Sequence, residues 1–162
     1  MTAEANAFFN RAPGGISLLK RSWVDGAILA SALLTFARYR NLELEVGLDS
    51  GRARKTLLTN LGVIKSRHFS GSFRYETGPL PDDGKLGIHV CEEMGRSEML
   101  KTLASLARGK FTGLSKTTSS EAQVAEVRSL DGTSFTVETD GEVNCTPSVR
   151  FEILSRRVQL CP

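Results

Sequence analysis

NLELEVGLDSG, residues 41–51, is the stretch of sequence that decides the fold. Leucine and valine alternate in it with Asn, Glu and Gly, which is the two-residue period of a half-buried strand. The Asp-Ser-Gly at its end predicts a turn. Because the next segment, Arg52 to Ile64, is again rich in apolar residues, the two runs are expected to pair as a β-hairpin. Asn60 and Gly62 predict an irregularity within the second run.

Further short strands and two helices are expected along the rest of the chain. Asp131-Gly132 is interpreted as a hairpin turn between two of the strands. Apolar residues at three- and four-residue spacing predict helices over Ser17 to Tyr39 and Ser97 to Arg108. Alternating apolar residues predict strands at Phe73 and Tyr75, Leu86 to Val90, Val124 to Val127, Phe135 to Val137, Val149 to Ile153 and Val158 to Leu160.

This pattern indicates a mainly β protein. About eight short strands with only two helices favour an antiparallel β-sandwich with two α-helices, because parallel sheets need longer helical crossovers. The chain has 162 residues, 40% of them hydrophobic, which suits one domain with a single core. We therefore expect a single domain over residues 1–162.

Charge and cysteine content exclude several classes of function. A net charge of +3 is compatible with anionic lipid or phosphate partners, but it is too weak a bias to imply nucleic acid. The three cysteines have no zinc-ligand spacing, so reduced thiols in a cytoplasmic protein fit best. The longest uncharged apolar run, residues 26–37, is shorter than the ~20 residues needed to span a bilayer.

The two histidines and the basic residues between Arg52 and His68 do not by themselves indicate a catalytic or metal site. His68 and His89 are interpreted as surface histidines, because His89 falls on an outward position of an alternating strand. The basic residues between Arg52 and His68 could attract the protein to an anionic membrane as a peripheral contact. A solvated sheet face explains the same residues.

Asp140-Gly141-Glu142 is the most informative motif in the chain. Asp-Gly is a common two-residue hairpin loop, which is one interpretation. The other is a pair of carboxylates that take part in proton transfer. The motif alone does not separate the two.

The order of motifs in residues 52 to 162 resembles the C-terminal part of bacterial diacylglycerol kinases and related lipid kinases. Those chains close with Asp-Gly-Glu, two further strands and a final proline. The matching segments here are Asp140-Gly141-Glu142, Thr146-Pro147, Phe151-Glu152-Ile153-Leu154 and Val158 to Pro162. Upstream, the loop from Gly78 to Leu86 is similar to the family's proline and Asp-Asp-Gly-x-Leu loop, and the helix that ends at Arg108 matches the family's next helix.

The resemblance implies a two-domain, ATP-dependent lipid kinase. Its C-terminal β-sandwich would pack against an N-terminal nucleotide-binding domain of the same protein. By this match Glu142 would accept the proton of the lipid hydroxyl, and Asp140 would orient Glu142 or help to hold Mg²⁺ and the ATP phosphates. A carboxylate in hydrogen-bond reach of the acceptor suits phosphoryl transfer.

The resemblance also implies a structural Mg²⁺ in the proline-containing loop. Its ligands would be the Asp83 side chain and the backbone carbonyls of Leu80 and Lys85. Oxygen ligands suit a hard cation that keeps several waters, so the site should be weak. The alternative is a turn with solvated carboxylates.

The family's Gly-Gly-Asp-Gly-Thr phosphate loop is not found in these residues. Leu130-Asp131-Gly132-Thr133 is similar but lacks the paired glycines that let backbone amides approach phosphates. We therefore expect a truncated piece of a longer protein or the product of a split gene, inactive alone. The alternative is a stand-alone β-sandwich that binds a lipid or a protein without catalysis. The acceptor, diacylglycerol-like or another lipid alcohol, stays open.

Overall fold

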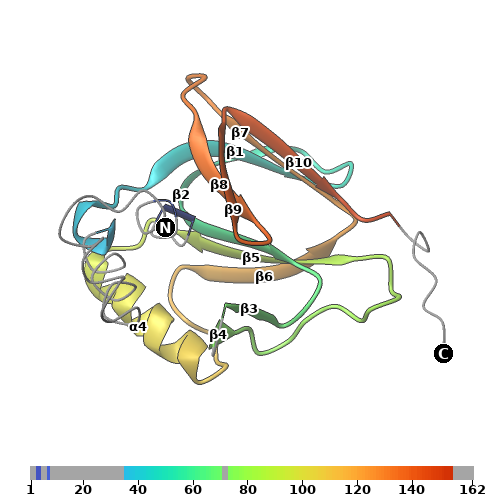
Figure 1. Ribbon diagram of the computed structural model, residues 1–162, viewed down its shortest axis with the longest axis horizontal. Coiled ribbons are helices and arrows are strands. Elements are labelled where there is room, and N and C mark those ends of the chain that lie inside the picture. The colour runs from blue at the N-terminus through green and yellow to red at the C-terminus, as the bar shows by residue number, and fades with distance from the viewer. Residues whose placement is uncertain (1–2, 5–6, 8–34, 71–72, 155–162) are drawn as a thin grey trace. The chain divides into compact units, whose positions relative to one another are not determined.

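Figure 1 shows the chain as a computed structural model. The structure describes residues 3–4, 7, 35–70 and 73–154. The chain divides into two compact units, one of residues 1–40 and 131–147 and the other of residues 41–130 and 148–162. The single domain expected over residues 1–162 stays a prediction.

The larger unit contains a six-stranded antiparallel sheet in the order β10-β7-β1-β2-β5-β6. β1 and β2 pair as the predicted hairpin, from Leu42 opposite Leu58 to Val46 opposite Arg54. The predicted irregularity is confirmed as a register shift between Leu58 and Asn60. The strands are β1 Leu42–Leu48, β2 Arg54–Ile64, β5 Leu86–Glu92, β6 Thr117–Ala122, β7 Val124–Ser129 and β10 Ser148–Glu152.

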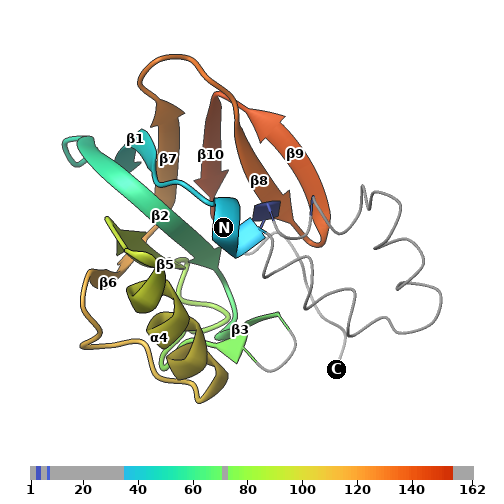
Figure 2. The ribbon, with the colours of Figure 1, turned by 90° about the vertical axis from the view of Figure 1, so that its left-hand side faces the viewer.

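One helix and a small two-stranded sheet complete the described part of this unit. Helix α4, Arg96–Ala107, confirms the predicted second helix to within one residue at each end. It follows β5 in the chain and is seen at the lower left of Figure 2. At its start the Glu98 carboxylate accepts the backbone N–H of Gly95 at 2.7 Å, which satisfies a donor that the helix leaves unpaired. The small sheet pairs β3, His68–Ser70, with β4, Phe73–Arg74.

Three aromatic rings form the centre of the core in this unit. Tyr75 stacks on His89 with 3.7 Å between ring centroids, and Phe111 meets both rings edge-on at 5.0 and 5.4 Å. His89 is only 4% exposed, so its interpretation as a surface histidine is wrong. Alternation places every second side chain of a strand in solvent only where one sheet face is open. On β5 both faces are covered, and residues 86–91 are all buried.

The stability of the protein is expected to fall in acid because of His89. Burial lowers the pKa of His89 from 6.5 to about 4, so between these values the unfolded chain binds a proton that the folded chain does not. The stabilisation is complete above pH 6.5 and is lost as the pH falls toward about 4. At about 1.4 kcal/mol per pKa unit, the loss is on the order of 3 kcal/mol. Urea unfolding at several pH values measures it, and a His89→Gln variant that kept the same pH dependence would contradict this origin.

The smaller unit contains a β-hairpin of β8, Phe135–Thr139, and β9, Glu142–Thr146. The predicted hairpin turn at Asp131-Gly132 is wrong, because in the described residues β7 pairs with β1 and β10 and β8 pairs with β9. Asp-Gly allows a sharp change of chain direction, but it does not determine which strands pair afterwards.

The predicted fold class is confirmed as mainly β and antiparallel. Two predicted elements fall largely outside the described residues. The first is the helix of Ser17 to Tyr39, of which residues 35–39 are described and residues 35–38 are helical. The second is the strand of Val158 to Leu160.

Candidate functional site

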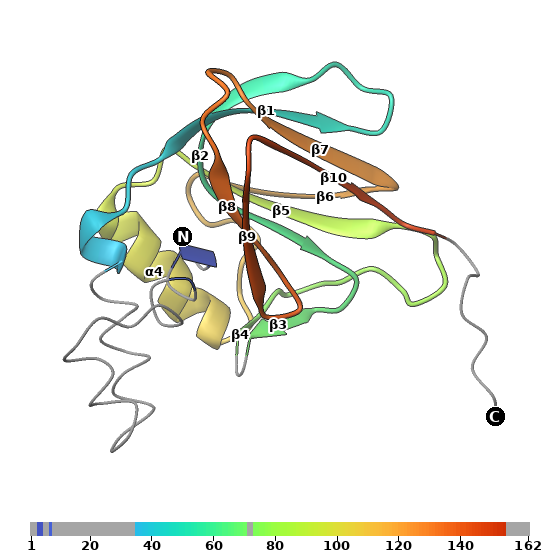
Figure 3. The ribbon, with the colours of Figure 1, turned by 45° about the horizontal axis from the view of Figure 1, so that its top comes forward.

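Asp140 and Gly141 form the two-residue loop of the β8–β9 hairpin, which is visible as two adjacent arrows in Figure 3. Both have left-handed backbone, with φ of 49° and 85°, the conformation of a type I′ turn. Thr139 pairs with Glu142 directly across this loop. The hairpin interpretation of the motif therefore holds for Asp140-Gly141, and it leaves the role of the carboxylates open.

The two carboxylates of the motif are both accessible. Asp140 and Glu142 are exposed, Asp140 in the loop and Glu142 as the first residue of β9. Because facing residues of a hairpin share a face, Glu142 lies on the face of Thr139, whereas Glu138 lies opposite Val143 on the other face. The turn thus fixes the backbone at Glu142, whose carboxylate is exposed.

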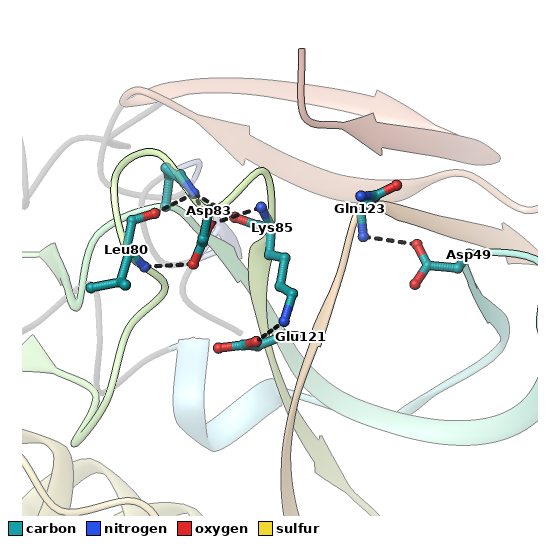
Figure 4. A network of polar contacts seen from close by, with 7 residues as sticks. Asp49, Leu80, Asp83, Lys85, Glu121 and Gln123 are labelled. Atoms are coloured by element: carbon teal, nitrogen blue, oxygen red, sulfur yellow. Dashed lines mark hydrogen bonds and ion pairs between the residues drawn. The ribbon is translucent and has the colours of Figure 1, made fainter. Parts of the chain in front are cut away.

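The proline-containing loop before β5 is organised by the Asp83 carboxylate. Its Oδ2 accepts the backbone N–H of Leu80 at 2.6 Å, and its Oδ1 accepts the backbone N–H of Lys85 at 2.9 Å (Figure 4). The backbone N–H of Asp83 approaches the Leu80 carbonyl at 3.5 Å. These contacts bring the loop backbone around one carboxylate.

The same loop presents three oxygens to the ammonium group of Lys65. Lys65 Nζ donates to Asp83 Oδ1 at 2.5 Å, to the Leu80 carbonyl at 2.6 Å and to the Lys85 carbonyl at 2.8 Å. These are the three groups expected to bind Mg²⁺. Local sequence patterns do not indicate Lys65, because it lies 15 to 20 residues away in the chain and approaches the loop only through the pairing of β2 with β5.

Asp83 and Lys85, two of the charged side chains of the loop, are paired. The hydrogen bond from Lys65, together with those from the backbone of Lys85 and Leu80, lowers the pKa of Asp83. The side chain of Lys85 instead donates to Glu121 on β6 at 2.9 Å, and this hydrogen bond raises the pKa of Lys85. The carbonyl and the side chain of Lys85 thus have different partners.

Ion pairs also neutralise two of the basic side chains between residues 52 and 68, where a membrane-binding patch was one of two interpretations. Arg54 pairs with Glu92 at 2.7 Å, and Lys65 pairs with Asp83. Among the described residues, no group of three or more His, Cys, Asp or Glu side chains is close enough to hold a metal ion. No helix in the described ranges is long and apolar enough to cross a membrane.

Two cysteines fall within the described residues, and both are free thiols. Cys145 is exposed, and Cys91 is buried on β5. Burial raises the pKa of Cys91 to about 12. The Cys91 thiol is therefore protonated near neutral pH and is a poor nucleophile.

The described strands form antiparallel sheets, which is the class of a β-sandwich-like domain. The model of the YegS C-terminal NAD kinase beta sandwich-like domain matches residues 19–161. The chain belongs to this family. The resemblance to the C-terminal domain of diacylglycerol kinase-like proteins is thereby confirmed, as is the expected β-sandwich class.

Solved structures share the fold. The chain is similar to a diacylglycerol kinase from Bacillus anthracis str. Sterne, with 15% identity and a TM-score of 0.55 over 75% of this chain and 43% of that one. Two further structures from this organism, each described provisionally as a diacylglycerol kinase, are 18% identical, with TM-scores of 0.56 and 0.55. They match 79% and 77% of this chain and 44% and 42% of theirs. The chain thus spans less than half the length of these structures. Among curated proteins, none matches the chain.

Proposed function

We propose that this chain is the acceptor-side part of an ATP-dependent lipid kinase, which transfers the γ-phosphoryl group of ATP to a diacylglycerol-like hydroxyl. The observation that carries the proposal is the family match over residues 19–161. The solved structures with this fold that are described as diacylglycerol kinases support a lipid alcohol as the acceptor. The chain alone would be inactive, because ATP would be bound mainly by an N-terminal kinase domain of the same protein.

In this proposal Glu142 is the catalytic carboxylate. The acceptor hydroxyl loses its proton to Glu142 as its oxygen attacks the γ-phosphorus, and ADP leaves from the opposite side. The exposed position of Glu142 beside a two-residue turn suits a group that must reach a substrate held by another domain. The Thr139–Glu142 pair fixes its backbone, which reduces the freedom lost when the substrate is positioned.

Asp140 has a supporting role in the same proposal. It is an exposed carboxylate, and oxygen ligands of this kind fit Mg²⁺. Asp140 would orient Glu142 or help to hold the Mg²⁺ that accompanies ATP. Bound there, Mg²⁺ would compensate the phosphate charge during transfer. The protein would work in the cytoplasm, in peripheral contact with the membrane that contains its substrate.

Transfer of labelled phosphate from ATP to lipid tests the proposed function. We expect label in the lipid alcohol when residues 1–162 act together with an N-terminal nucleotide-binding domain, and none with residues 1–162 alone. The coding sequence upstream is expected to encode a Gly-Gly-Asp-Gly-Thr loop. An unrelated gene there, together with saturable binding of residues 1–162 to lipid vesicles without any transfer, would favour a stand-alone binding module instead.

A further inference from the structure

We propose that the ammonium group of Lys65 is the permanent cation of the loop formed by residues 78–85, in place of the divalent ion that the sequence resemblance implies. The loop would then keep its conformation without bound metal. The inference rests on the contacts of Lys65 and is independent of the catalytic role given to Glu142.

The hydrogen bonds of the Lys65 ammonium are saturated by the loop. An ammonium group has three N–H donors and no acceptor. Here the three acceptors are Asp83 Oδ1, the Leu80 carbonyl and the Lys85 carbonyl, at 2.5 to 2.8 Å. One carboxylate and two carbonyls also balance the charge of one monovalent cation. Lys65 therefore satisfies both the hydrogen bonding and the charge of these three oxygens.

The same contacts leave no room for a metal ion on the side of the ammonium. Mg²⁺ binds oxygen at about 2.0–2.1 Å. An ion on this side, bound to the three oxygens that contact Lys65 Nζ, would overlap the ammonium group. Its two positive charges would also be added beside a lysine that already neutralises the only carboxylate of the set. The donor set therefore fits an ammonium ion better than Mg²⁺ while Lys65 is present.

The fold holds Lys65 in this position. Lys65 follows the last residue of β2, Ile64, which pairs with Gly87 near the start of β5. The loop packs closely against β5, because a Cβ at Gly87 would lie 3.1 Å from Pro79 Cδ. Lys65 thus connects the end of β2 to the loop that leads into β5. Its side chain is 30% exposed and that of Asp83 is 19% exposed, so the pair is partly shielded from water.

Lys85 provides a matched control within the same loop. Its carbonyl accepts from Lys65, but its own ammonium group donates to Glu121. A Lys85→Ala variant therefore removes the same charge as Lys65→Ala and leaves all three oxygens and Lys65 unchanged. The Lys85–Glu121 pair is about half exposed, so its loss should have little effect on stability.

Thermal unfolding of the full chain, with EDTA or with MgCl₂ and without ATP, tests the inference. We expect the melting temperature of the wild type and of Lys85→Ala to be the same in both conditions. Lys65→Ala should melt about 3–6 °C lower in EDTA, because Asp83 loses its countercharge. Mg²⁺ should restore part of this loss, since the three oxygens are then accessible to a hydrated ion. The double variant Lys65→Ala, Asp83→Asn should not respond to Mg²⁺.

In the unfolding experiment, three results would overturn the inference. One is a rise in the wild-type melting temperature with Mg²⁺ that Asp83→Asn abolishes. Another is an unchanged melting temperature for Lys65→Ala, and the third is a loss that Mg²⁺ does not reverse. If Lys65→Ala does not fold, the inference is tested on the wild type instead. Binding of Mn²⁺ to the wild type is then measured by electron paramagnetic resonance. Bound Mn²⁺ that Asp83→Asn removes would overturn the proposal, and its absence would support it.

Discussion

Replacing Glu142 by Gln in the complete kinase is expected to lower kcat by about 10²-fold or more, the usual contribution of a general base. The amide keeps the size of the side chain but cannot take up the proton of the acceptor hydroxyl. Folding should be unaffected, because Glu142 is exposed at the first position of β9. Transfer of labelled phosphate to lipid measures kcat, and the melting temperature monitors folding.

Glu138→Gln is the matched control for this variant. Glu138 is an exposed glutamate of the same hairpin and lies on the face opposite to Glu142. The same change of charge at Glu138 should leave kcat within about threefold of the wild-type value, because surface substitutions away from such a site have small effects. An equal loss of kcat in Glu138→Gln and Glu142→Gln would indicate a general effect of the removed charge. Normal turnover in Glu142→Gln would remove Glu142 from the mechanism.

Replacing Phe111 by Ala is expected to have the largest effect on stability, a loss of about 3–5 kcal/mol. Phe111 is 1% exposed and meets Tyr75 and His89 edge-on. Its removal eliminates the buried ring and leaves a cavity beside two rings that remain stacked on each other. For a chain of this size the melting temperature should fall by roughly 10 °C.

The cavity should also change the titration of His89. In the described residues, His89 Nε2 is buried without a hydrogen-bond partner, and burial is what lowers the pKa of His89. Water that enters the space left by Phe111 would solvate the imidazolium and move this pKa back toward 6.5. NMR titration of the imidazole in Phe111→Ala measures this change.

Leu100→Ala is the control for Phe111→Ala. Leu100 lies on α4 and is 49% exposed, so its truncation should change the free energy of unfolding by about 0.5 kcal/mol or less. Urea unfolding of both variants provides the comparison. A loss of less than about 1 kcal/mol in Phe111→Ala would mean that Phe111 contributes little to the core.

Sequence alone predicted the elements whose signals are local. The alternation from Leu42 to Leu48 predicted β1, and the Asp-Ser-Gly turn predicted its pairing with β2. The spacing of apolar residues before Gly109 predicted α4 to within one residue at each end. These signals succeed because a strand, a tight turn and a helix end depend on residues that are adjacent in the chain.

Pairing over longer distances was not predictable in the same way. Asp131-Gly132 has the composition of a hairpin turn, yet in the described residues β7 pairs with β1 and β10. His89 follows the outward positions of its strand but is covered by Tyr75 and Phe111. Both predictions assumed local rules, whereas neighbours distant in the chain determined the outcome.

The same distinction between local signals and contacts distant in the chain applies to the candidate sites. Sequence by itself determined the carboxylates of Asp140 and Glu142 and the left-handed turn between them, because Asp-Gly favours that backbone. The family resemblance implied that the oxygens of Asp83, Leu80 and Lys85 share one cation, which stays a prediction for Mg²⁺. Only the tertiary structure decided which cation meets those oxygens, since Lys65 approaches them through the register of β2 and β5. A contact made across a sheet depends on the pairing energy of whole strands. This energy cannot be evaluated from a short stretch of sequence.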